Sequence, residues 1–408
     1  MTRPFEELVA LARHPATASN ALSRAECLEA TRAFVGARRQ EILRLHRAGQ
    51  SGTNVVRMLS DMADTVLRGV LYFGVRSLPG SGGPGGPLLS RVALCALGGY
   101  GRRELSPYSD IDVCLLFEGA MDDYVEGLNG YLVPFLWDAG FVAGYAVRSV
   151  DEAIALVRED IKVFTSFLEA RLLVGDGTVF ARMRLSMREF QAGRLGAAFV
   201  EHKVRDRYEE LPEAYRDMYQ PEPNIKENAG GLRDFHTALW LLMMAYGADT
   251  LDDAVAQELI TPEEQLEFVD GLDFLWRIRN ELHFRAGKAD DRLTFANQRH
   301  VARSLGYGEG SEHDALAELM QDYYAAASKL RRFLRIAARI CHYPMSPVRP
   351  EARGAAPGSH ALSSAPEWVL ENGFLHTRGN GANRFAHNPA RLMEAFWRCA
   401  RDLAQLSR

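Results

Sequence analysis

Apolar residues follow a helical period through the first part of the chain. Over residues 28–45 and 54–73 they recur every three to four positions, as on one face of an amphipathic helix. Ser23 precedes the first of these segments and Glu26 follows it by three positions, which is the pattern of a helix-capping box. Residues 1–75 are therefore predicted to form an N-terminal helical region.

The next apolar segments are short runs instead of periodic stripes. Residues 94–97 and 113–117 are such runs and predict two strands, and residues 141–149 predict a third. A helix is expected between the last two strands, over residues 124–139. This alternation indicates an α+β region, and the Gly- and Pro-rich segment at 80–87 is expected to be a flexible linker before it.

Helical periodicity returns at residue 177 and continues to about residue 343. The helices expected there include residues 268–287, 298–305 and 314–337. Four regions follow from these patterns. They are an N-terminal helical region, an α+β domain, a helical domain, and a linker with a short tail, at residues 1–75, 76–176, 177–343 and 344–408.

The last region has a different composition from the rest. Residues 344–366 are rich in Pro, Gly, Ala and Ser, which is typical of a linker. Residues 368–375 are expected to form a short hairpin, and residues 389–406 a final helix.

Composition argues against several classes of protein. The chain has 408 residues and a formal net charge of −5, and its charges are spread along it, which argues against a nucleic-acid binder. No apolar run reaches the ~20 residues that cross a bilayer, and no signal peptide is evident, so no membrane association is expected. The cysteines are scattered without a C-x-x-C pair, which predicts neither a zinc site nor a disulfide framework and favours the cytoplasm.

Candidate chemistry begins with Asp110 and Asp112, at the start of the second predicted strand. Residues two apart on a strand point to the same face, so the two carboxylates are expected to lie side by side. Such carboxylates repel each other unless a cation lies between them, and Mg²⁺ is typically bound by one or two carboxylates plus substrate phosphates. The pair therefore predicts a Mg²⁺ site, with Mn²⁺ as an alternative ion; a simple strand cap is the competing interpretation.

A glycine turn separates the first predicted strand from this pair. Gly98 and Gly99 leave room for backbone amides to approach an anion, and residues 102–104 are expected to open a helix whose dipole favours negative charge. A Gly-Gly pair alone is typical of an ordinary turn. The order of strand, glycine turn and Asp-x-Asp strand nevertheless favours a nucleoside triphosphate site.

These residues also resemble a known family. The segment 97–112, Leu-Gly-Gly-Tyr-Gly-Arg-Arg-Glu-Leu-Ser-Pro-Tyr-Ser-Asp-Ile-Asp, resembles the DNA polymerase β-like nucleotidyltransferases and, more narrowly, the uridylyltransferases that modify the nitrogen regulator PII. The resemblance implies an α+β fold, with a polymerase β-like mixed sheet, flanking helices and a mainly helical domain. It also implies nucleotide binding by Arg102 and Ser109. Arg103 stands where the family usually has Gly, and either a phosphate contact or a solvent-facing side chain fits it.

A second segment resembles the same family. Pro-Asn-Ile-Lys-Glu at 223–227 and Gly-Gly-Leu-Arg-Asp at 230–234 match an element of the PII uridylyltransferases. Prolines prevent a helix at its start and the glycines form a turn, so Lys226, Arg233 and Asp234 are expected on an exposed loop and helix start. Lys226 and Arg233 are candidate nucleotide contacts. Asn228 stands where the family usually has Gly, so the loop geometry is expected to differ slightly.

Other polar residues have two interpretations each. Glu169 precedes Ala-Arg where the family has an acid, which implies a catalytic and metal-binding role in a two-metal displacement; a surface pair with Arg171 is the alternative. Arg148 fits either a triphosphate contact or an ion pair with a core acid. Arg279 and His283, four positions apart on a predicted helix, favour a surface pair over the lining of a cleft.

The adjacent His313 and Asp314 invite comparison with the metal-binding pair of a phosphohydrolase. Ser311 stands three positions before Asp314, which makes a helix cap the favoured explanation. No separate His and Asp that would complete such a metal site is evident in this region.

The resemblance implies an activity, which remains an expectation at this point. It is transfer of UMP from UTP to a tyrosine hydroxyl of a PII-type signalling protein, with release of pyrophosphate. The family continues into phosphohydrolase and small-molecule-sensing domains, so the chain is expected to be a truncated or short relative without uridylyl removal or glutamine sensing. Transfer of another nucleotide to another protein, such as adenylylation, and a non-catalytic nucleotide-binding regulator are the alternatives.

Overall fold

The computed structural model describes residues 23–78, 89–308 and 311–341, together with four short strands between residues 360 and 406. The chain divides into two compact units, residues 1–334 and 335–408. The segment at 80–87 that was predicted to be a linker lies outside the described residues. The first unit contains both sequence motifs, and its helices and sheet confirm the predicted α+β class.

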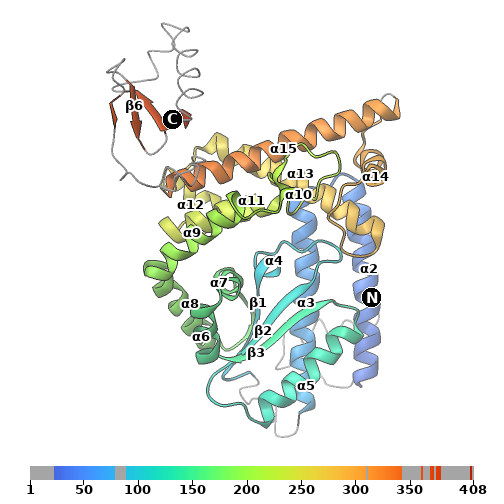
Figure 1. Ribbon diagram of the computed structural model, residues 1–408. Helices are drawn as coiled ribbons and strands as arrows, with labels where there is room; N and C mark the ends of the chain where they lie inside the picture. Colours follow the sequence, from blue (N-terminus) through green and yellow to red (C-terminus); the bar gives the residue numbers. More distant parts are fainter. Residues whose placement is uncertain are drawn as a thin grey trace. The chain divides into compact units, whose positions relative to one another are not determined.

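The N-terminal region forms two long helices that lie side by side, α2 (Arg24–Arg47) and α3 (Gly52–Ser77) (Figure 1). Ser23 caps α2 as predicted: its hydroxyl accepts the Glu26 amide at 3.3 Å, and the Glu26 carboxylate accepts the Ser23 amide at 2.8 Å. The apolar stripe predicted for α3 is buried, at Val55, Val56, Leu59, Met62, Val66, Leu67, Val70 and Leu71.

Four strands form a mixed sheet in the order β3-β2-β1-β4. β2 pairs antiparallel with β1 and parallel with β3, and β4 pairs antiparallel with β1. The three predicted strands are confirmed, whereas β4 was not predicted because its apolar run is too short for a period to be recognised. The strands are β1 (Val92–Ala96), β2 (Ile111–Phe117), β3 (Ala143–Ser149) and β4 (Arg171–Gly175).

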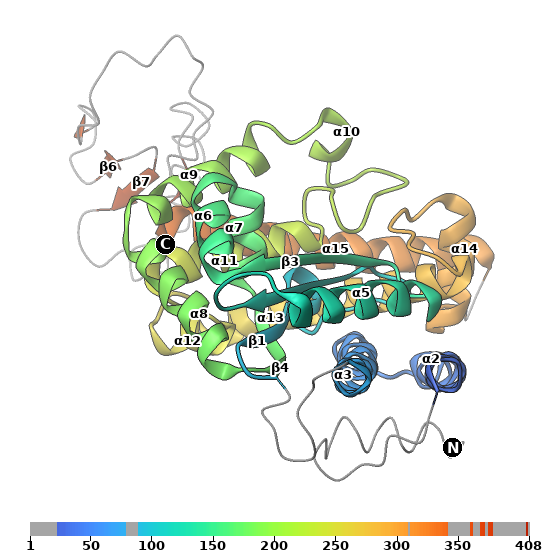
Figure 2. The same ribbon diagram turned by 90° about the horizontal axis from the view of Figure 1, so that it is seen from below.

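The two faces of this sheet are covered by separate hydrophobic cores, since side chains alternate between the faces. On β2, Val113 and Leu115 pack with residues of α2, α3 and α5 (Asp123–Asp138), whereas Cys114 and Leu116 pack with residues of α6 (Val150–Glu159), α7 (Ile161–Leu168) and α8 (Gly177–Ala192). Figure 2 shows α2 and α3 end-on, on the side of the sheet away from α6 and α7. Asp112 belongs to the face of Cys114, at the end where β2 begins.

The second half of the first unit is helical, as predicted. Figure 1 shows α11 and α13 near α4 (Gly98–Gly101), the one-turn helix that follows β1. The remaining elements are α9 (Arg194–Tyr208), α10 (Glu213–Arg216), α11 (Leu232–Tyr246), α12 (Leu251–Ala256), α13 (Pro262–Ala286), α14 (Phe295–Leu305) and α15 (Glu312–Ile340).

The second unit contains the predicted hairpin, formed by β6 (Trp368–Glu371) and β7 (Phe374–Thr377). β5 (His360–Ala361) pairs with β6 and therefore places a strand inside the predicted linker, the rest of which lies outside the described residues. The predicted final helix also lies outside them, except for β8 (Gln405–Leu406), which pairs with β7. The prediction that this helix extends to residue 406 is wrong, because the chain there forms a strand.

The described thiols, Cys27, Cys95, Cys114 and Cys341, are all free. Cys399 lies outside the described residues. Within the residues that the structure describes, no helix is long and apolar enough to span a membrane.

Candidate functional site

A cavity of about 580 Å³ lies at the end of the sheet where β2 begins. Its walls come from α4, α7, α9, α11, α13 and the loops between them. Every residue that the sequence predicted for the site lines this cavity: Gly98, Gly99, Arg102, Ser109, Asp110, Asp112, Glu169, Lys226 and Arg233. The fold therefore brings the two sequence motifs together.

The glycine turn is itself a single helical turn, α4, directly after β1. Gly98 has a φ of +52°, a conformation that favours glycine, and a side chain there would come 3.6 Å from Oδ2 of Asp112. The helix expected at residues 102–104 is not formed, because α4 ends at Gly101 with Arg102 as its C-cap, and Arg103 has a φ of +64°. The Arg103 side chain leaves the cavity and pairs with Asp61 of α3.

The two aspartates form the acidic end of the cavity. Burial raises the pKa of Asp112, and the charge of Asp110 raises it further, while the ammonium of Lys226 lowers it. A carboxylate with a raised pKa beside a second carboxylate is a site that a cation would stabilise. Two carboxylates fit Mg²⁺ where substrate phosphates supply further oxygen ligands. In the described part of the chain, no group of three or more His, Cys, Asp or Glu residues is arranged for a metal ion.

A glycine on the neighbouring strand leaves the space that Asp112 occupies. Gly144 of β3 is the register partner of Asp112, and a Cβ atom at this position would lie 2.3 Å from Oδ1 of Asp112. The predicted strand gave no indication of this contact, which depends on the parallel pairing of β2 with β3. Arg148, on the same strand, is exposed and donates to the carbonyl of Val147 at 3.0 Å, and it does not line the cavity.

Arg102 lies between two carboxylates. Its Nε donates to Glu104 at 2.6 Å and its Nη1 donates to Glu169. Burial alone would lower the pKa of Arg102, but the two carboxylates raise it above its ordinary value. Burial would raise the pKa of Glu104, but Arg102 and His236 lower it to about 2. Glu104 is therefore ionised, and the guanidinium that was predicted to contact nucleotide is held by Glu104 and Glu169.

Glu169 has both carboxylate oxygens engaged. One accepts from Arg102 and the other from the indole N–H of Trp240, and its side chain is only 3% exposed. The alternative surface pair with Arg171 is not formed, since Arg171 binds Asp64 of α3 at 2.7 and 3.0 Å. The metal-binding role of Glu169 stays a prediction.

These contacts join the glycine turn to α11 at two successive helical turns. Glu104 lies 2.7 Å from Nε2 of His236, and Glu169 accepts from Trp240, four residues further along α11. His236 and Trp240 were not recognised as site residues in the sequence. Their only signal was a spacing of four beside an apolar run, which is also the signature of a buried helix face.

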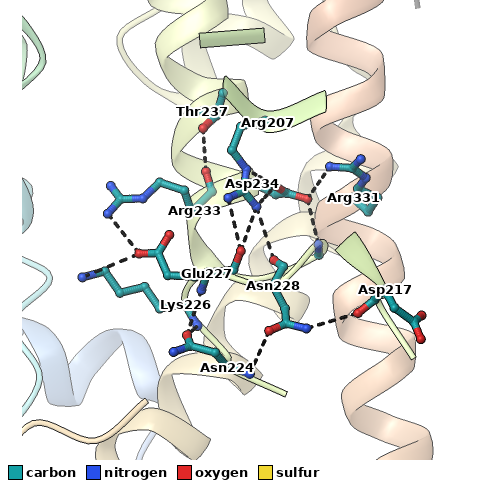
Figure 3. A network of polar contacts seen from close by, with 11 residues as sticks. Arg207, Asp217, Asn224, Lys226, Glu227, Asn228, Arg233, Asp234, Thr237 and Arg331 are labelled. Atoms are coloured by element: carbon teal, nitrogen blue, oxygen red, sulfur yellow. Dashed lines mark hydrogen bonds and ion pairs between the residues drawn. The ribbon is translucent and has the colours of Figure 1, made fainter. Parts of the chain in front are cut away.

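A buried acid, Asp234, anchors the loop of the second motif (Figure 3). Asp234 is fully buried, and its carboxylate accepts from Nε of Arg207 at 2.8 Å, from Nη1 of Arg331 at 3.0 Å and from the amide of Gly230 at 2.7 Å. The prediction that Asp234 is exposed is wrong. Its position at a helix start gave no sign that arginines of α9 and α15 enclose it.

Asn228 stabilises the same loop with its side chain. Its Oδ1 accepts the amide of Asn224 at 2.9 Å, and its Nδ2 donates to the carbonyl of Asp217 at 3.1 Å. Lys226 and Arg233 lie on the other side of the loop (Figure 3), 4.0 and 3.3 Å from the same oxygen of Glu227. The loop thus presents two cations toward the cavity while its backbone is fixed from behind.

The pair on α13 contributes to the cavity as well. Arg279 and His283 both contact Asp291, at 2.7 and 3.2 Å, and Arg279 and Asp291 line the cavity. The surface-pair interpretation is therefore wrong, because the loop that follows α13 folds back over this face. Ser311 caps α15 as predicted, since its hydroxyl accepts the amide of Asp314 at 3.2 Å.

Comparison with known proteins identifies the relatives of this chain. Residues 198–337 match the family model described as GlnD PII-uridylyltransferase. The chain is 34% identical over 290 residues to a bifunctional uridylyltransferase/uridylyl-removing enzyme of Phenylobacterium zucineum (strain HLK1). The aligned residues make up 71% of this chain and 31% of that protein. It is 34% identical over 287 residues to a protein of the same name from Caulobacter vibrioides (strain NA1000 / CB15N), covering 70% and 30%.

A third relative, from Azospirillum brasilense and of the same name, is 34% identical over 300 residues, covering 73% of this chain and 32% of that protein. The chain spans about a third of the length of these curated relatives. The resemblance that the two motifs predicted is confirmed.

We expect Gly144→Ala to disrupt the acidic end of the cavity. The added Cβ would displace the Asp112 carboxylate, which is the far end of a side chain, so the sheet should remain folded while the aspartate pair separates. Mg²⁺ binding, measured by isothermal titration calorimetry with the nucleotide present, should weaken by about tenfold or more. Gly130→Ala in α5, where a Cβ meets nothing within 4 Å, is the control and should bind as the wild type does.

We expect Asp234→Asn to destabilise the first unit. The change leaves the buried Arg207 without a charged partner, and breaking such a pair costs about 3–5 kcal/mol. Chemical denaturation followed by circular dichroism measures the loss. Asp217→Asn changes an exposed carboxylate beside the same network and should alter the free energy of unfolding by less than about 0.5 kcal/mol. Equal stability of the two variants would contradict the structural role of Asp234.

Proposed function

We propose that this chain is a Mg²⁺-dependent enzyme that transfers UMP from UTP to a tyrosine hydroxyl of a PII-type signalling protein. The match of residues 198–337 to the family model described as GlnD PII-uridylyltransferase supports this proposal. One observation supports this most directly. The aspartate pair, the glycine turn and the cations of the second motif line a single cavity. A polyphosphate with a divalent cation matches that arrangement of charge.

The proposed roles follow the chemistry of each group. Asp110 and Asp112 would hold the metal ion, and Mn²⁺ is an alternative to Mg²⁺. When bound, the ion would neutralise charge on the triphosphate and orient it. The amides of Gly98 and Gly99 would donate to phosphate oxygens, since no side chain blocks their approach. Ser109 lies beside the aspartates in the cavity wall.

Lys226 and Arg233, which line the same cavity, would bind further phosphate oxygens. In the protein alone both cations lie near Glu227, at 4.0 and 3.3 Å, and the arginine is only one-third exposed. An anionic ligand would therefore compete with one carboxylate for two cations. Arg102 was expected to contact the nucleotide directly. Because Glu104 and Glu169 bind its guanidinium, we propose instead that it positions the glycine turn against α11.

The reaction itself would be an in-line displacement. The acceptor oxygen forms a bond to the α-phosphorus, the bond from that phosphorus to the bridging oxygen breaks, and pyrophosphate leaves with the bond electrons. The acceptor proton is released to solvent. The residues of the cavity orient the triphosphate and compensate its charge, and no covalent intermediate with the protein is required. The cytoplasm is the proposed location.

We expect Asp112→Asn to abolish transfer and leave the fold intact. The change removes half of the proposed cation site, which should lower the rate by about a thousandfold or more, while the strand pairing of residue 112 is unaffected. Intact-mass measurement of a PII protein after incubation with Mg²⁺ and UTP follows the reaction. Asp61→Asn, at a half-exposed carboxylate of α3, is the matched control. Normal transfer by Asp112→Asn would exclude the proposed metal role.

The same assay with each of the four nucleoside triphosphates separately tests the proposed substrate. We expect the mass of one uridylyl group per PII subunit with UTP alone. An adenylyl gain would keep the mechanism and change the nucleotide. Absence of any gain, with nucleotide binding retained, would contradict the transferase proposal and favour a regulator.

Glu169→Gln separates the two roles considered for Glu169. If the carboxylate contacts only Arg102 and Trp240, the Mg²⁺ concentration for half-maximal transfer should stay within about threefold of the wild type, because the amide oxygen still accepts from Trp240. A shift of about tenfold or more would assign Glu169 to the metal site. Titration of initial rate against Mg²⁺ at saturating UTP makes the measurement.

A further inference from the structure

We propose that Lys203, together with Lys162, forms a second anion subsite of this cavity, which binds the leaving pyrophosphate of the reaction. This inference rests on the proposed function for the identity of the anion. The residues that carry it belong to neither sequence motif: Lys203 lies on α9 and Lys162 lies at the start of α7, and both line the cavity.

The distribution of lysine in the chain is the first observation. The sequence contains 5 lysines and 43 arginines. Lys162, Lys203 and Lys226 all line this one cavity, so most of the lysines of an arginine-rich chain meet at a single site. A lysine ammonium is a compact charge with three rotatable donors, and it contacts phosphate oxygens without the fixed planar geometry of a guanidinium.

The arginines of the cavity already have carboxylate partners. Arg102 binds Glu104 and Glu169, Arg233 lies 3.3 Å from Glu227, and Arg279 lies 2.7 Å from Asp291. Among the described residues, no carboxylate forms an ion pair with Lys203. A cation in a cavity wall without an ionic partner is a group that an anionic ligand would compensate.

Two aromatic rings fix the position of this cation instead. The ammonium of Lys203 lies 4.9 Å from the ring centroid of Trp240 and 5.3 Å from that of Phe199. Trp240 is held in turn by its hydrogen bond to Glu169. The ring faces attract the cation but supply no hydrogen-bond acceptor of the strength of a carboxylate or phosphate. The donors of the ammonium therefore remain available to a ligand.

The charges around Lys203 favour the binding of an anion there. The pKa of Lys203 is lowered to about 8. Burial is the main cause, Asp206 on the same helix and Glu169 oppose the shift, and Arg233 of α11 and Lys162 of α7 add to it. Cations that destabilise one another in this way around a cavity would be stabilised by a polyanion.

The location separates this subsite from the aspartate pair. Lys226 is the cation whose charge lowers the pKa of Asp112, whereas Lys203 interacts with Arg233 and Lys162. A triphosphate whose reacting phosphorus lies at the aspartates would extend its outer phosphates toward the second group of cations. When the bond from the α-phosphorus to its bridging oxygen breaks, the additional charge would develop on the pyrophosphate, close to Lys203.

The first measurement is the affinity of the full chain for inorganic pyrophosphate, by isothermal titration calorimetry at pH 7. Lys203→Met keeps the packing of the stem on Trp240 and Phe199 but removes the charge, so the dissociation constant should rise by about tenfold to a hundredfold. Lys203→Arg should retain most of the affinity. Lys329→Met on α15, away from the cavity, is the matched control and should bind as the wild type does. Thermal unfolding verifies that each variant is folded.

A pH series distinguishes a direct contact from an effect on structure. Lys203 loses its proton near pH 8 and arginine does not. Between pH 7 and 9 the wild type should therefore lose pyrophosphate affinity relative to Lys203→Arg. Parallel pH profiles for the two proteins would overturn the proposal.

The outcomes also separate this inference from the proposed function. Wild-type affinity for pyrophosphate in Lys203→Met, or no binding by the wild type, would overturn the subsite even if UMP transfer is observed. Binding that depends on Lys203 in a chain without transferase activity would support the subsite and contradict the transferase proposal instead.

Discussion

The largely buried ion pairs of Arg102 are the constraint on which the site depends. A guanidinium that is mostly enclosed between Glu104 and Glu169 is stable only while both carboxylates remain close to it, because a charge withdrawn from water without a partner is costly. Glu104 in turn contacts His236, and Glu169 accepts from Trp240. The glycine turn after β1 therefore cannot move relative to α11 without breaking the contacts that Glu104 and Glu169 make with His236 and Trp240. This explains how two segments far apart in the sequence keep one cavity between them.

The second motif is organised by the same principle with the charges reversed. There a buried carboxylate, Asp234, is enclosed by Arg207 and Arg331 and by a backbone amide. Arg102 of the first motif, a predicted nucleotide contact, has structural partners instead, and Asp234 of the second motif, which was expected to be exposed, is enclosed. Lys226 has a distant ionic partner, and Lys203 has none among the residues that the structure describes. Such side chains are the ones left to interact with a ligand.

Local patterns were sufficient for the long helices, most strands and the aspartate pair, because each depends on spacing within one element. They did not reveal α6 and α7, and the helix expected at residues 102–104 is not formed. The contacts that shape the site could not be predicted in this way. Gly144 matters only because β3 lies parallel to β2 in one register, and Lys203 matters because α9 packs beside Trp240. The burial of Asp234 was missed for the same reason, since its arginine partners come from two other helices. The resemblance to a family identified the motifs but not these supports.

The charges of the cavity restrict what can occupy it. A neutral ligand would leave Asp110 and Asp112 repelling each other and Lys203 without a counter-ion. A free anion would satisfy the lysines but would meet the aspartates unfavourably. A free divalent cation would satisfy the aspartates and leave the lysines as they are. Only a ligand that brings a cation and a polyanion together compensates both ends, which is why a metal-bound polyphosphate fits this cavity better than any of its components alone.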